Sequence, residues 1–132
     1  MTILDVMNWI KTLETKADNY YAGTLDSKRD KSFGIYQRKG VPNNKTAIGG
    51  IECTKTGVKG ISILIHWTSN SDTTEKVSLD LYECLRNARN ATINNEKVNY
   101  IRLLQDEPVD VGADENGIFE RVIECDIYYG RS

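Results

Sequence analysis

One segment, from Val58 to Trp67, restricts the fold more than any other part of the sequence. Large apolar residues occupy every second position in it, and residues of mixed polarity lie between them. The apolar positions are Ile61, Ile63, Ile65 and Trp67, and the intervening ones are Ser62, Leu64 and His66. Successive side chains of a strand point to opposite faces of a sheet, and β-branched residues favour strands. The pattern therefore predicts a β-strand with one face in a hydrophobic core.

A second long strand is predicted over residues 118–129. Its apolar residues share one face, which Arg121 interrupts. They are Phe119, Ile123, Cys125, Ile127 and Tyr129. The opposite face carries Glu120, Glu124 and Asp126, a pattern typical of the solvated side of an antiparallel sheet. We therefore expect these three acidic side chains to face solvent.

Two other segments predict amphipathic helices, because their apolar residues recur at spacings of three and four. In the first, the apolar stripe consists of Ile3, Val6, Met7, Ile10 and Leu13. In the second, it consists of Val77, Leu81, Cys84, Leu85 and Ala88. Asp72 is the predicted N-cap of this second helix, and Glu75 stands at the spacing that completes a capping box. Poor helix formers predict its end near residues 87–90.

The order of these elements predicts an α+β fold. Further strands are expected at residues 33–38, 46–51 and 96–105, in places where turn-forming residues separate short apolar runs. Two helices packed on one face of a mostly antiparallel sheet would bury all of the apolar stripes. With 132 residues, the chain is expected to form a single domain over residues 1–132.

Charge and composition exclude several classes of partner. The net charge of −2 gives no general attraction for nucleic acid or an anionic membrane. We expect no membrane helix, since no apolar run approaches ~20 residues, and no signal peptide, since Asp5 and Asn8 interrupt the first apolar stretch. Cys53, Cys84 and Cys125 are widely spaced and odd in number, which favours free thiols in a reducing compartment.

Residues for catalysis are hard to find. His66 is the single histidine and lies in a predicted strand, so a structural role is expected for it. Ser62 also lies inside that strand and lacks the glycines of a nucleophile elbow. Gly49-Gly50 lacks the remaining residues of a phosphate-binding loop and instead indicates a bulge or strand end. We expect no catalytic residue, no cofactor and no zinc site, because paired cysteine or histidine spacings are missing from the sequence.

The acidic segment 106–117 is the best candidate for a metal site in the sequence. If Gly117 were the turn glycine of a calcium loop, the first and twelfth ligand positions would be Gly112 and Ile123, neither of which carries a carboxylate. A solvated loop closed by a turn at Asn116-Gly117 is the favoured interpretation. A cation held between subunits is the alternative, and we assign no metal ligand.

An apolar element inside this charged segment suggests contact with a partner. The run consists of Pro108, Val109, Asp110 and Val111. Each valine would contribute about 1.5 kcal/mol or more if buried against another protein, and long connections without regular structure tend to be functional. Tyr128 and Tyr129, expected at an exposed end of the last strand, are the second candidate interface.

One cluster of basic residues is present. It consists of Lys28, Arg29, Lys31, Arg38 and Lys39. Because Asp26 and Asp30 are interspersed, a salt-bridged surface is the favoured interpretation. The alternative is weak, sequence-independent contact with DNA phosphates.

Several stretches, taken in order, resemble a known family. They are residues 21–26 and 31–36, Ile48-Gly49-Gly50, residues 63–67, and residues 107–112 leading to 117–124. From about residue 20 to the C-terminus the chain resembles the tail terminators of long-tailed bacteriophages and prophages, which are often labelled minor capsid proteins. The resemblance rests on the order and spacing of these stretches, none of which is a catalytic signature.

The resemblance implies a non-enzymatic virion protein made in the bacterial host cytoplasm. Such proteins form a ring, usually a hexamer, on the head-proximal end of the tail tube, where the ring ends tube polymerisation and offers the surface that joins the head. The implied partners are copies of the chain itself, the tail tube protein and a head-completion or neck protein, with DNA passing only transiently through the lumen. The implied fold is a curved sheet with helices on one side. A neck connector and a nucleic-acid-binding module remain the alternatives.

Overall fold

A computed structural model describes residues 1–38 and 56–130 of the chain. The elements within these ranges are α1 (Ile3–Ile10), β1 (Asn19–Ala22), β2 (Ser32–Gln37), β3 (Thr56–His66), α2 (Ser71–Arg86), β4 (Thr92–Ile93), β5 (Glu96–Leu103), β6 (Val109–Ala113) and β7 (Phe119–Gly130). Both predicted helices are present, as are the strands predicted near residues 33–38, 58–67, 96–105 and 118–129. The expectations for residues 46–51, Gly49-Gly50, Cys53 and Lys39 lie outside the described residues.

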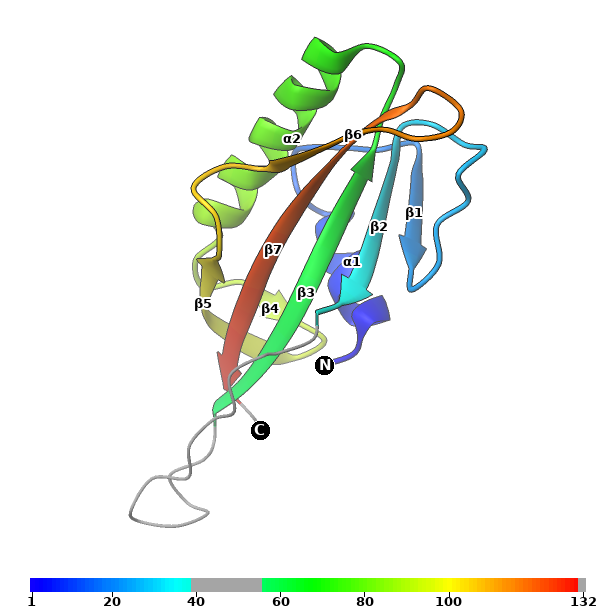
Figure 1. The fold of residues 1–132 in the computed structure, drawn as a ribbon. Helices are drawn as coiled ribbons and strands as arrows, with labels where there is room; N and C mark the ends of the chain where they lie inside the picture. The colour runs from blue at the N-terminus through cyan, green and yellow to red at the C-terminus, as the bar shows by residue number, and fades with distance from the viewer. Residues whose placement is uncertain (39–55, 131–132) are drawn as a thin grey trace.

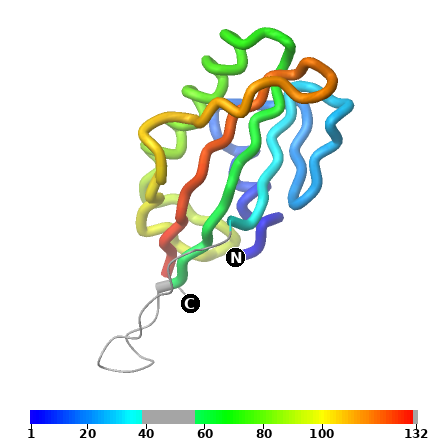
Figure 2. The backbone as a smooth tube through the Cα atoms, in the orientation of Figure 1, coloured from blue at the N-terminus to red at the C-terminus, as the bar shows by residue number. Residues whose placement is uncertain are grey.

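The strands form one sheet with the order β1-β2-β3-β7-β5-β4, and β6 pairs with the first part of β7 on the same edge that β5 uses further along. Of the described strand pairs, only β1 and β2 run parallel. The long central pair runs from Thr56 opposite Gly130 to His66 opposite Glu120. The sheet twists and curls strongly along its length (Figures 1 and 2). The predicted α+β fold, mostly antiparallel with a curved sheet, is confirmed.

The hydrophobic core lies between the sheet and the two helices, which sit on the same side of it (Figure 1). The alternation in β3 sets this face, since Ile61, Ile63 and Ile65 are fully buried. Val6 and Ile10 of α1 and Leu81 and Leu85 of α2 pack into the same cluster. The helical stripes and the alternating strand therefore predicted the core face correctly.

The opposite side of the sheet carries the polar positions of β3 and β7. We call it the uncovered face, because α1 and α2 both lie on the other side (Figure 1). The expectation that the acidic side chains here face solvent is wrong for Asp126, which is fully buried, and Glu120 keeps only 17% of its side chain exposed. The reason is that Arg38 pairs with Asp126, while neighbouring loops fold across the end of the sheet near Glu120.

Asn70, and not Asp72, caps the N-terminus of α2. The Asn70 side-chain oxygen accepts a hydrogen bond from the Thr73 amide at 3.0 Å, and its backbone is extended. Asp72 already lies in the first turn of the helix, where it forms an exposed ion pair with Lys76. The cap prediction was wrong because the chain leaves β3 and enters the helix two residues earlier than the capping-box spacing indicated.

The acidic segment before the last strand was expected to be a solvated loop. It instead contains the strand β6. The backbone of β6 pairs with β7 from Val109 opposite Val122 to Ala113 opposite Phe119. The turn that follows was predicted correctly. In it, Gly117 adopts a φ of +78°, and the Asp114 carboxylate accepts hydrogen bonds from the Asn116 and Ile118 amides.

Candidate functional site

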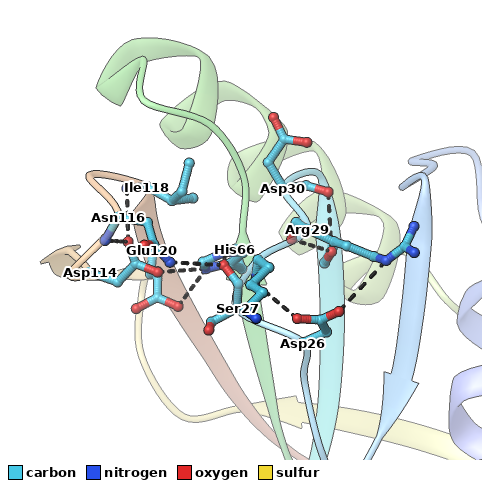
Figure 3. Close-up of polar contacts among 11 residues, drawn as sticks. Asp26, Ser27, Arg29, Asp30, His66, Asp114, Asn116, Ile118 and Glu120 are labelled. Carbon is cyan, nitrogen blue, oxygen red and sulfur yellow. Dashed lines mark hydrogen bonds and ion pairs between the residues drawn. The ribbon is translucent and has the colours of Figure 1, made fainter.

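A buried polar cluster lies on the uncovered face where β3 ends and β7 begins. His66 has no exposed surface and stands directly opposite Glu120 in the sheet. Its Nδ1 atom lies 2.8 Å from Glu120 Oε2 and 3.7 Å from Asp114 Oδ2. Its Nε2 atom lies 3.0 Å from the carbonyl oxygen of Ser27, in the connection between β1 and β2 (Figure 3).

The contact with Ser27 assigns a proton to one ring nitrogen of His66. A backbone carbonyl can only accept a hydrogen bond, so Nε2 carries a proton and donates it to Ser27. Nδ1 is therefore the atom that turns toward Glu120 and Asp114. One ligand atom from each of these three residues lies within 4.8 Å of the others.

Two connections hold this cluster in place. The β6–β7 turn presents Asp114, whose Oδ1 atom is fixed by the Asn116 and Ile118 amides, each at 2.9 Å. The β1–β2 connection presents the Ser27 carbonyl, which the Asn116 side chain also reaches at 3.4 Å. Figure 3 shows both connections meeting at His66.

The β1–β2 connection is seated over a glycine. A Cβ atom at Gly34 would lie 3.0 Å from Leu25 Cδ1 and 2.9 Å from the Tyr36 ring, so any side chain here would displace one or both of them. Burial raises the pKa of the Tyr36 phenol; a hydrogen bond with the Leu25 backbone lowers it, and the charge of Glu120 raises it further. Tyr36 therefore stays protonated at neutral pH.

The predicted basic cluster is divided in the structure. Arg38 forms an ion pair with the buried Asp126, and only 13% of its side chain is exposed. Lys28, Arg29 and Lys31 are exposed. They lie in the β1–β2 connection, with Lys31 directly before β2. Arg29 lies 3.6 Å from Asp26, an exposed pair of the kind that contributes little to stability.

The predicted contact segment is an edge strand. Val109 and Val111 of β6 are 43% and 54% exposed, whereas the preceding Pro108 is buried. Asp110 is also exposed, and its carboxylate lies 3.9 Å from the Arg121 guanidinium. Two exposed valines therefore lie on this edge strand, one of them at the bulge between Asp110 and Gly112.

The two tyrosines at the end of β7 differ from each other. Tyr129 is only 8% exposed, so the expectation of an exposed pair is wrong. Its ring covers Gly57, where a Cβ atom would lie 2.4 Å from the ring. Tyr128 stacks on Tyr100 of β5 with ring centroids 4.4 Å apart, and Tyr100 is 52% exposed. Sequence reasoning missed Tyr100, because a bulge in β5 shifts its register.

The fold and surface define the class of protein. It is a small α+β domain whose curled sheet has helices on one face and an edge strand with exposed valines. Within the described residues, no helix is both long enough and apolar enough to cross a membrane.

The chain belongs to the bacteriophage tail terminator family, because it matches the family model described as bacteriophage tail terminator protein over residues 3–129. It is therefore a structural protein of the phage tail, and the resemblance found in the sequence is confirmed. No curated protein matches the chain.

Proposed function

We propose that this chain forms a ring of identical subunits on the head-proximal end of the tail tube, where it ends tube polymerisation and provides the head-joining surface. The observation that carries the proposal is the family match over residues 3–129. The proposed partners are other copies of the chain, the tail tube protein and a neck protein.

A closed ring of identical subunits needs two different surfaces on each subunit, which meet head to tail at a fixed rotation. The valines of β6 suit one of these surfaces, because Val109 and Val111 are exposed on a monomer and gain from burial. Each interface of standard size buries about 800 Å² per partner, so the valines would form only part of it.

The ring's two faces have different tasks in this proposal. One face must resemble the next layer of the tail tube, and the other must not accept a further layer. The lumen has to let DNA pass without binding it strongly. The net charge of −2 is compatible with a lumen that lacks the positive charge needed for strong phosphate binding.

The proposal is tested by letting phage particles assemble without this protein and imaging the products by negative-stain electron microscopy. A terminator predicts overlong tails that carry no heads, because nothing stops the tube from growing. Complementation with the intact chain should restore tails of uniform length. Tails of normal length beside heads that lose their DNA would contradict the proposal and would favour the role of a neck connector.

A further inference from the structure

We propose that His66, Asp114 and Glu120 form a binding site for a divalent transition-metal ion such as Zn²⁺. An imidazole nitrogen and two carboxylate oxygens are ligands that zinc accepts, and three protein ligands leave one position of a tetrahedral ion open. The inference does not depend on the proposed ring. It departs from the sequence-based expectation of no zinc site, which considered only ligands close together in the chain.

The distances in the cluster suit such an ion. Zinc bonds of about 2.0–2.2 Å at tetrahedral angles place neighbouring ligand atoms roughly 3.3–3.6 Å apart. His66 Nδ1 lies 2.8 Å from Glu120 Oε2 and 3.7 Å from Asp114 Oδ2, on either side of that spacing. A small outward movement of the Glu120 side chain, which is 17% exposed, would let the ion enter.

The electrostatics of the cluster also favour a cation. The Nε2 atom of His66 donates to the Ser27 carbonyl, so Nδ1 is the ring atom that faces the two carboxylates. Its 2.8 Å contact with Glu120 is a hydrogen-bond distance, and a divalent ion would take the place of the proton between these two atoms. His66 is fully buried, while Asp114 and Glu120 keep 16% and 17% of their side chains exposed, so an ion could reach the cluster from the carboxylate side. A divalent ion at their centre would bind all three.

Atoms outside the cluster hold two of the ligands in place. A ligating histidine usually donates its second ring N–H to a carbonyl or carboxylate, which is the arrangement between His66 and Ser27. Asp114 uses Oδ1 to accept hydrogen bonds from the Asn116 and Ile118 amides, so Oδ2 remains available for the ion. Two of the three ligands are thus held in position before any ion binds.

Zinc in this site would join parts of the chain that are distant in sequence. His66 belongs to β3, Glu120 to β7 and Asp114 to the turn before β7, while Ser27 ties the β1–β2 connection to the same point. Because zinc would bind the folded state and the unfolded chain lacks this arrangement, binding should stabilise the fold by mass action.

The test is a zinc titration of the full chain after removal of metals by a chelator, at neutral pH. Because His66 is the single histidine, its ring signals in NMR spectra are assigned without ambiguity. We expect these signals to change with one equivalent of Zn²⁺. We also expect the Tm to rise by about 5 °C or more at a hundredfold excess of zinc over its Kd.

Two variants distinguish zinc binding at this site from zinc binding elsewhere on the chain. In Glu120→Gln the new carboxamide can donate a hydrogen bond to Nδ1, so the fold should persist while zinc affinity falls by about a hundredfold or more. Glu115→Gln removes an exposed charge from the same turn without removing a ligand, and it should bind zinc as the natural chain does.

Three results would overturn the proposal. In the first, the His66 signals do not respond to saturating zinc, which would leave a histidine–carboxylate pair without a metal. In the second, zinc binds while those signals stay fixed, which would point to the thiols. In the third, Glu120→Gln keeps the zinc affinity of the natural chain.

Discussion

At the scale of single residues, an ion pair crosses the middle of the uncovered face. Arg38 reaches Asp126 across Gly60, which is paired with Asp126 and accepts a hydrogen bond from the Arg38 amide at 3.0 Å. Asp126 is fully buried, so this ion pair lies out of contact with solvent on the carboxylate side.

We predict that Asp126→Asn lowers the free energy of unfolding by about 3 kcal/mol, because it leaves the largely buried Arg38 guanidinium without this carboxylate. Urea denaturation measures the change. Glu107→Gln removes an exposed carboxylate and should change stability by less than about 0.5 kcal/mol. Equal effects of the two substitutions would contradict the prediction.

The thiol of Cys125 should be inert in the folded protein. Burial raises the pKa of this thiol to about 12, and the neighbouring Asp126 charge adds to the effect. Thiolates are the reactive form, so the raised pKa keeps Cys125 in its unreactive thiol form at pH 8. We predict that a maleimide labels Cys125 in urea but not in buffer, as peptide mass mapping would reveal. Rapid labelling of Cys125 in the folded chain would show that this strand opens readily.

At the scale of secondary structure elements, the start of α2 depends on Asn70. We predict that Asn70→Ala lowers the free energy of unfolding by about 1 kcal/mol, because the Thr73 amide loses its acceptor. Asn70→Asp retains a capping oxygen and should have little effect. Asp72→Ala removes only an exposed ion pair with Lys76 and should cost less than Asn70→Ala in the same denaturation measurements.

The edge strand β6 gives a prediction about assembly. Val111→Lys should leave the stability of the monomer unchanged within about 0.5 kcal/mol, because the side chain is already 54% exposed. It should nevertheless weaken the association of subunits, since it would place a charge in the proposed interface. Sedimentation velocity, with and without purified tail tubes, measures the association.

A matched control for this substitution is Leu4→Lys on α1, where an apolar side chain is 53% exposed at a different surface. Association should be retained in this variant. If Leu4→Lys dissociates the assembly while Val111→Lys does not, the interface lies on the helical side of the molecule.

At the scale of the whole molecule, a ring predicts a definite mass. We expect a hexamer of the 14.9 kDa chain when the protein is concentrated or bound to tube ends, as measured by light scattering or native mass spectrometry. A chain that remains monomeric at high concentration and does not bind tail tubes would contradict the ring.

Much of the fold follows from local sequence patterns. The alternation of Ile61, Ile63 and Ile65 identified a strand and its buried face, because the side-chain period of a strand is a property of the backbone itself. Helical spacing likewise identified α1 and α2. By contrast, β6 has no clear strand pattern, and it forms because its backbone pairs with the free edge of β7.

The candidate site could not be predicted in the same way. His66 and Glu120 are 54 positions apart, and Arg38 and Asp126 are 88 apart. The sequence alone determined that polar residues occupy one face of the long strands. Only the tertiary structure decided that His66 meets Glu120 and Asp114, and that Arg38 meets Asp126. Strand register and loop packing arise from contacts between distant segments, and no local pattern of residues records them.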